Sequence, residues 1–260
     1  MQAEAGEAGK SDGAALRALM RRAGDFLLPP RCLSCGAGLD RHYAFCAPCW
    51  SAFDFIGEPF CRITGAPFAY DPGEGAVSAA ALARPPAFTR ARAALLYNDA
   101  AARLISRLKY GDRLELAPTF ARLMAQAGAG LLAEADLICP VPLHARRLLW
   151  RRFNQAAELS RALARLSGKP ADPEILLRHR PTKAQVGLSA GARRRNVAGA
   201  FSLKAGKGAK IAGKHVLLVD DVLTTGATVE ACTRVLLKEG AAMVSVLTIA
   251  RVAGEEVPPI

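Results

Sequence analysis

An acidic pair followed by a loop of threonine and glycine has the residue types that bind a phosphorylated sugar. Residues 216–228 read VLLVDDVLTTGAT, in which four apolar residues precede Asp220 and Asp221. A run of four apolar residues suits a strand that is buried on both faces of a parallel sheet. The acids then lie at the carboxyl end of this strand, where open α/β sheets bind ligands. Carboxylates accept hydrogen bonds from ribose hydroxyls, whereas threonine hydroxyls donate to a phosphate that carboxylates would repel.

The loop after the acidic pair is the expected phosphate site. Gly226 tolerates a positive φ, and the free N–H groups of the following helix point at any anion above the loop. The expected contacts come from Val222, Leu223, Thr224, Thr225, Gly226, Ala227 and Thr228. The lysine of a Walker loop is absent, and no G-x-G-x-x-G dinucleotide motif follows the strand. A solvated turn or a helix cap is the alternative explanation for two adjacent aspartates.

Four cysteines predict a second kind of site. Cys32 and Cys35 form one CxxC pair, and Cys46 and Cys49 form another ten residues later. Thiolates at this spacing can close a tetrahedral zinc site of the structural type. Disulfides are the alternative in an exported protein, but the odd total of seven cysteines and the lack of a recognisable export signal favour a reducing compartment. We therefore expect structural zinc and a cytoplasmic location.

Composition limits the class of protein and of partner. The chain has 260 residues, of which 51% are hydrophobic, enough to fill a core. No apolar stretch reaches the length of about 18 residues that a spanning helix needs, so no membrane insertion is expected. With 35 basic and 23 acidic residues, the net charge is +12, which attracts polyanions, nucleic acid included.

The chain divides into four segments. Residues 1–25 predict a disordered or short helical tail, 26–68 a zinc-ribbon module, 69–90 a linker and 91–253 the large domain. Within that domain, hydrophobic periodicity predicts strands at 93–97, 136–141, 216–219 and 243–249 and helices at 99–109, 115–127, 154–167 and 228–239. Alternating strands and helices of this kind predict an α/β fold with a doubly wound, mostly parallel sheet.

Two resemblances follow from these motifs. Residues 216–228 resemble the phosphoribosyl-pyrophosphate (PRPP) binding motif of type I phosphoribosyltransferases. LKYGD at 108–112, CPVPLH at 139–144, RRFNQA at 151–156 and RRRNVAGAF at 193–201, together with the cysteine pairs, resemble the ComF family of competence-associated, phosphoribosyltransferase-like proteins. That family usually has a further CxxC, of which only Cys61 is present here, with Thr64 in its partner's place; a second zinc site is therefore in doubt.

The resemblance implies roles for individual residues. Asp220 and Asp221 would be the catalytic acids that hold the ribose and support magnesium bound with PRPP. A loop that clasps pyrophosphate would consist of Pro140, Val141, Pro142, Leu143 and His144. A mobile basic loop would include Lys183, Gln185, Arg193, Arg194 and Asn196. Prolines that merely end a strand, and a solvated basic loop, are the alternatives. Lys109 and Tyr110 face either this site or the zinc module.

Two classes of function remain open at this point. The first is an enzyme that transfers phosphoribosyl to an undetermined base or amine. The second is a non-catalytic module that binds PRPP or a nucleotide and acts with single-stranded DNA, beside a helicase partner, as the family name implies. The zinc knuckle and the positive charge favour the second class. The oligomeric state stays undetermined.

Overall fold

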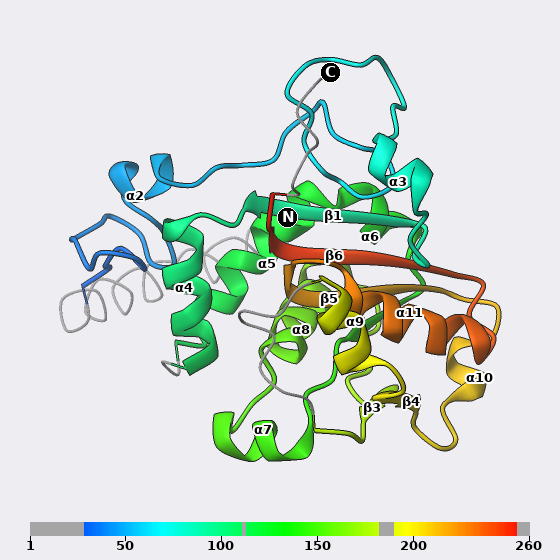
Figure 1. The fold of residues 1–260 in the computed structure, drawn as a ribbon. Helices are drawn as coiled ribbons and strands as arrows, with labels where there is room; N and C mark the ends of the chain where they lie inside the picture. Colours follow the sequence, from blue (N-terminus) through cyan, green and yellow to red (C-terminus); the bar gives the residue numbers. More distant parts are fainter. Residues whose placement is uncertain (1–28, 111–112, 182–189, 254–260) are drawn as a thin grey trace, which may run out of the picture. The chain divides into compact units, whose positions relative to one another are not determined.

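The structure, a computed structural model, describes residues 29–110, 113–181 and 190–253 (Figure 1). The predicted tail 1–25 lies outside the described residues. By packing, the chain forms two compact units, Met1–Trp50 and Ser51–Ile260. The smaller unit contains both CxxC pairs and most of α2 (Ala47–Ser51). The larger unit contains the sheet and therefore the predicted phosphosugar motif.

A four-stranded parallel sheet is the centre of the larger unit. Its strands, in spatial order, are β1 (Arg90–Leu96), β6 (Met243–Arg251), β5 (His215–Leu223) and β2 (Leu137–Pro140). Every neighbouring pair is parallel. The residues of β5 from Val216 to Val219 are all buried, which agrees with their unbroken apolar sequence. A parallel sheet with covering helices confirms the predicted α/β class.

Two groups of helices cover the sheet. One group packs on β1, β2, β5 and β6 and contains α5 (Leu116–Ala127) and α8 (Gln155–Ser167). The other is centred on α11 (Ala227–Lys238), which contacts α9 (Ala190–Val197) and a short antiparallel pair, β3 (Leu176–Arg178) and β4 (Phe201–Leu203). The remaining helices are α3 (Ala79–Ala83), α4 (Asp99–Tyr110), α6 (Ala129–Glu134), α7 (Ala145–Arg151) and α10 (Gly208–Ile211). None of the described helices is long and apolar enough to cross a membrane.

Strand alternation separates the two acids. Val216 and Leu218 belong to the core cluster on the α11 side of the sheet. Successive side chains of a strand point to opposite faces of the sheet. The Asp220 side chain therefore lies on the α11 side, and the Asp221 side chain lies on the other face, where α8 packs. The strand runs to Leu223, paired with β6 as far as Arg251, so Val222 and Leu223 still belong to the strand after the acids. The expectation that they follow a strand ending at Val219 was wrong, because β5 continues beyond them.

The segment before β1 packs on the sheet. Phe55 forms a bridge with Leu95, and Ala91 donates its N–H to the Ile63 carbonyl at 2.7 Å. Gly65 lies against the same strand with φ +67°, and a Cβ there would come within 2.5 Å of the Ala91 carbonyl oxygen. Residues 51–68, which the sequence groups with the zinc module, therefore pack as part of the larger unit.

Candidate functional site

A cavity of about 700 Å³ opens at the carboxyl ends of the sheet strands. Of the predicted site residues, it is lined by Val141, Leu143, Asp220, Asp221, Val222, Leu223, Thr224, Gly226, Ala227 and Thr228. Thr225 is exposed and lies outside the lining. Pro140 and Pro142, which are buried, and His144, which is half-buried, also lie outside it. Pro140 ends β2, and the His144 ring accepts the Arg146 N–H as the N-cap of α7. The structure thus brings the two predicted loops to one cavity.

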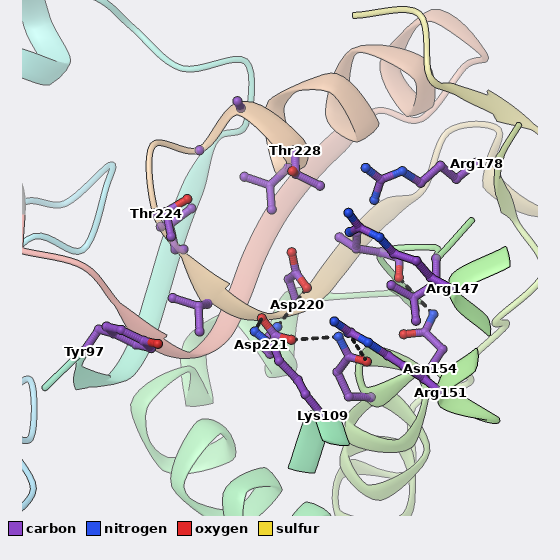
Figure 2. A pocket seen from close by; sticks show the side chains of 18 of the residues that line it. Tyr97, Lys109, Arg147, Arg151, Asn154, Arg178, Asp220, Asp221, Thr224 and Thr228 are labelled. Atoms are coloured by element: carbon purple, nitrogen blue, oxygen red, sulfur yellow. Dashed lines mark hydrogen bonds and ion pairs between the residues drawn. The ribbon is translucent and has the colours of Figure 1, made fainter. Parts of the chain in front are cut away.

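Asp221 is held by two side chains from different helices. Its carboxylate oxygens meet Lys109 Nζ of α4 at 3.0 Å and Gln155 Nε2 of α8 at 2.8 Å, and its side chain is buried (Figure 2). Burial alone would lower the pKa of Lys109, but the Asp221 charge outweighs it and raises that pKa. Lys109 therefore stays protonated and neutralises Asp221.

Asp220 has a different environment. Loss of solvent around the carboxyl group, followed by the Asp221 charge, raises the pKa of Asp220 to about 7. Its Oδ1 accepts the Asp221 N–H at 2.9 Å, and the side chain projects into the cavity (Figure 2). The two adjacent acids thus have different surroundings, because Asp221 has the Lys109 ammonium beside it and Asp220 faces the cavity.

The predicted phosphate loop lies above the acids. Gly226 adopts φ 78° as the residue before α11, a conformation that glycine takes without strain. The first N–H groups of this twelve-residue helix have no partner within the helix and carry its positive dipole end. Thr224 and Thr228 face the same cavity on either side of this turn (Figure 2). The loop can therefore bind a phosphate.

Two arginines line the side of the cavity away from Thr224. Arg178 of β3 is 8% exposed and stacks on Phe201 with its guanidinium carbon 5.2 Å from the ring centre. Burial lowers the pKa of Arg178, and the nearby charge of Arg147 from α7 lowers it further. The two positive charges repel each other, so an anion bound between them would stabilise both. Figure 2 shows both side chains directed at the space beside Asp220.

The predicted mobile basic loop is only partly described. Lys183 and Gln185 lie outside the described residues. Arg193, Arg194 and Asn196 fall in α9, and the Asn196 carbonyl accepts from Arg180 at 3.3 Å.

Several cavity residues were missed or left undecided by the sequence. Lys109 was undecided between two sites, Arg178 was not among the residues named for the basic loop, and Gln155 had no assigned role. Asn154 is the N-cap of α8, and it accepts the Ala156 N–H at 3.0 Å. Its amide also donates to the Val141 carbonyl at 3.0 Å, which ties α8 to the predicted pyrophosphate loop. For Lys109, Asn154 and Gln155, the signal in the sequence was their position in the motifs LKYGD and RRFNQA.

The four cysteines of the smaller unit form a metal-binding geometry. The sulfur atoms of Cys32, Cys35, Cys46 and Cys49 all lie within 4.8 Å of one another. Backbone N–H groups of Ser34 and Cys46 donate to Cys32 Sγ at 3.4 and 3.3 Å. Burial alone would raise the pKa of Cys32, but such hydrogen bonds lower it to about 6. Four thiolates in this arrangement fit tetrahedral zinc.

The turn that follows Cys61, a second knuckle, repeats the backbone hydrogen bonds of the turn that follows Cys32, the first knuckle, but it lacks the second cysteine. In the first knuckle, Gly36 N–H donates to Cys32 O at 3.0 Å and Cys32 N–H to Ala37 O at 2.7 Å. Around Cys61, Gly65 and Ala66 reproduce the two bonds at 2.8 and 2.7 Å. Thr64 stands where the second cysteine would be. Within the described residues, the four-cysteine cluster is the only group of three or more His, Cys, Asp or Glu residues that could hold a metal.

Comparisons with known proteins agree with both sites. Residues 23–81 match the model of the double zinc ribbon domain, and residues 180–260 match that of the phosphoribosyl transferase domain. The chain is 38% identical over 176 residues to DNA utilization protein YhgH of Salmonella typhimurium, covering 65% of this chain and 75% of that protein. It is 37% identical over 153 residues to competence protein F of Haemophilus influenzae, covering 57% of this chain and 66% of that protein. With its zinc-ribbon and phosphoribosyltransferase domains, the chain belongs to the ComF family of phosphoribosyltransferase-like proteins.

Proposed function

We propose that the protein binds PRPP in the cavity and transfers its phosphoribosyl group to an acceptor. The observation that carries this proposal is the placement of three different chemistries around one space. The loop 222–228 suits the 5′-phosphate, the acids suit the ribose hydroxyls, and Arg147 with Arg178 suits the pyrophosphate.

The reaction that this arrangement supports is a displacement at C1 of the ribose. The lone pair of the acceptor forms a bond to C1 while the C1–O bond breaks, and the electron pair of that bond leaves with pyrophosphate. The proton of an N–H acceptor passes to water or to the departing pyrophosphate. Positive charge develops on the sugar and negative charge on the leaving group, so the ionised Asp220 and the two arginines would stabilise opposite ends of the transition state.

The acids also suit magnesium bound together with PRPP. Both oxygens of Asp221 already have partners, Lys109 and Gln155, which leaves Asp220 as the carboxylate facing the cavity. Magnesium usually keeps several waters and binds substrate phosphates with one or two carboxylates. Bound magnesium would neutralise charge on the pyrophosphate, and Asp220 would hold the magnesium beside the ribose.

The second candidate is a non-catalytic module that handles single-stranded DNA, with a helicase as its partner. The net charge of +12, the zinc ribbon and relatives named for DNA utilization and competence favour it.

The mobile basic loop that would cover PRPP remains a prediction from sequence. A cytoplasmic location and the boundaries of the four segments also remain predictions from sequence.

Pyrophosphate release separates the two candidates. The parent protein is mixed with PRPP, magnesium and a panel of bases and amines, and release is followed with time. A transferase gives release that depends on one class of acceptor. Release no faster than without protein, combined with DNA binding that weakens steeply with salt, would instead support the binding module.

The pKa of Asp220 predicts a pH dependence. Since the raised pKa is about 7, the carboxylate is mostly protonated at pH 6 and mostly ionised at pH 8. The ionised form is the one that holds magnesium and ribose hydroxyls, so affinity for magnesium and PRPP should fall about tenfold from pH 8 to pH 6. Calorimetric titrations across this range measure it.

Asp220→Asn provides the control for that experiment. PRPP titrates over the same range in both proteins, whereas the amide that replaces the carboxyl group in the variant cannot lose a proton. The variant should therefore lose the part of the pH dependence that belongs to the protein. Identical pH profiles for parent and variant would rule out Asp220 as the titrating group.

Arg178 gives a test of the pyrophosphate side. Arg178→Gln should weaken PRPP binding by about 10- to 150-fold, the equivalent of the 1.5–3 kcal/mol of a hydrogen bond to a charged group. Binding of ribose 5-phosphate, which has no pyrophosphate, should change little. Arg165→Gln on the exposed end of α8 is the matched control. Equal losses for both ligands would show that Arg178 acts on the fold and not on pyrophosphate.

A further inference from the structure

An exposed aromatic pair lies on the cavity lining without a role in the packing of the core. Tyr110, the last residue of α4, is 57% exposed, and Trp150 of α7 is 72% exposed. Their ring centres are 5.6 Å apart at an interplanar angle of 60°. No residue of α7 is buried. The aromatic side chains therefore do not stabilise a core, and their place on the cavity suggests a ligand.

A chain of hydrogen bonds connects this pair to Asp221, one of the two acids of the site. The Arg151 guanidinium lies over the Tyr110 ring, 4.6 Å from its centre, and its Nη2 donates to the Tyr110 hydroxyl at 2.8 Å. Arg151 Nη1 donates to Gln155 Oε1 at 3.3 Å, and Gln155 donates to Asp221 at 2.8 Å. The aromatic pair is thus positioned relative to Asp221 by direct contacts.

The three parts of PRPP leave this cluster unassigned. The phosphate loop, the acids and the arginines Arg147 and Arg178 account for phosphate, ribose and pyrophosphate. An acceptor must reach C1 of the ribose, so its subsite must adjoin the acids. The cluster of Tyr110, Trp150 and Arg151 adjoins them through Gln155 and lines the same cavity.

We propose that Tyr110, Trp150 and Arg151 form the acceptor subsite and that it takes a planar nitrogen heterocycle of nucleobase type. This proposal rests on the proposed function. An exposed aromatic side chain can stack on a planar ring, an interaction worth about 1–3 kcal/mol per base. Arg151 can donate to ring nitrogens or carbonyl oxygens at the edge of such a ring. A small aliphatic amine has neither a flat face nor such acceptors, so it would gain little from this surface.

Fluorescence of Trp150 tests the assignment directly. The chain has two tryptophans, and Trp50→Phe removes the one that lies in the smaller unit. This single-tryptophan protein is titrated with adenine, hypoxanthine, cytosine and uracil, with and without PRPP and magnesium. At least one base should quench Trp150 saturably. Tyr110→Ala in the same background should weaken that binding about 5- to 150-fold, the equivalent of one lost stacking contact.

The matched control is Leu149→Ala, which removes an 81% exposed side chain of the same helix that does not line the cavity. It should bind bases as the single-tryptophan protein does. No quenching by any base, in a protein that calorimetry shows to bind PRPP, would overturn the subsite and leave the proposed function standing. Quenching by oligothymidylate but by no free base would overturn it in favour of a DNA surface. Base quenching without PRPP binding would contradict the proposed function and overturn the role of these residues as an acceptor subsite, leaving a base-binding surface alone.

Discussion

Replacing Cys35 with serine is expected to release zinc and unfold residues 29–50, while residues 51–253 keep their fold. The smaller unit has few buried residues, so the metal supplies most of its stability. Structural zinc contributes about 10–16 kcal/mol in zinc-finger peptides, far more than so short a segment can replace. Metal analysis gives the zinc content, and limited proteolysis followed by mass spectrometry locates the unfolded segment.

Cys61→Ser is the matched control, because Cys61 heads a knuckle of the same backbone shape in the larger unit. It should leave the zinc content unchanged at one equivalent per chain. Two equivalents in the parent would show that the second knuckle also binds metal despite Thr64. A parent without zinc, or with these cysteines paired in disulfides, would contradict the zinc site.

Placing a carboxylate at Thr228 should have the largest effect on ligand binding. Thr228 lines the cavity in the first turn of α11, where the N–H groups and the helix dipole favour an anion. Thr228→Asp removes a hydroxyl donor to phosphate, worth about 1.5–3 kcal/mol, and adds direct repulsion. PRPP affinity should fall by more than about 100-fold, measured by calorimetry with circular dichroism to verify folding.

Two milder substitutions at the same position separate the causes. Thr228→Ser keeps the hydroxyl and should bind nearly as the parent does. Thr228→Val removes the hydroxyl without adding charge, and its affinity for PRPP should lie between those of the serine and aspartate variants. If serine, valine and aspartate bind PRPP equally, the phosphate does not lie at this turn.

Much of the sheet could be predicted because its signals are local. The apolar run 216–219, the alternation of strands and helices and the Thr/Gly loop each depend on neighbours in sequence. The end of β5 could not be placed, since Asp220 and Asp221 remain in the strand through pairing with β6, which follows only after the whole of α11. The strands β3 and β4 have three residues each, too few for a periodic pattern.

The residues that would bind a ligand or metal could be predicted from the sequence, but the side chains that contact those residues could not. The acids and threonines form one short motif, and the cysteines form two. By contrast, Lys109 and Gln155 reach Asp221 from helices 112 and 66 residues away in sequence. Arg178 meets the cavity because β3 pairs with β4, which packs on α11, and no local pattern encodes that arrangement. Neither the different surroundings of the two acids nor the aromatic pair could therefore be derived from sequence.

Calorimetric titration of the full chain with PRPP and magnesium tests the central claim most directly. We predict saturable binding with one PRPP per chain. Asp220→Asn should keep the fold, because that carboxyl is already about half protonated at pH 7, yet bind PRPP more weakly. Asp221→Asn should also bind more weakly, with some loss of stability because Lys109 loses its partner. No binding by the parent, or equal binding by the parent and both folded variants, would contradict a PRPP site at this cavity.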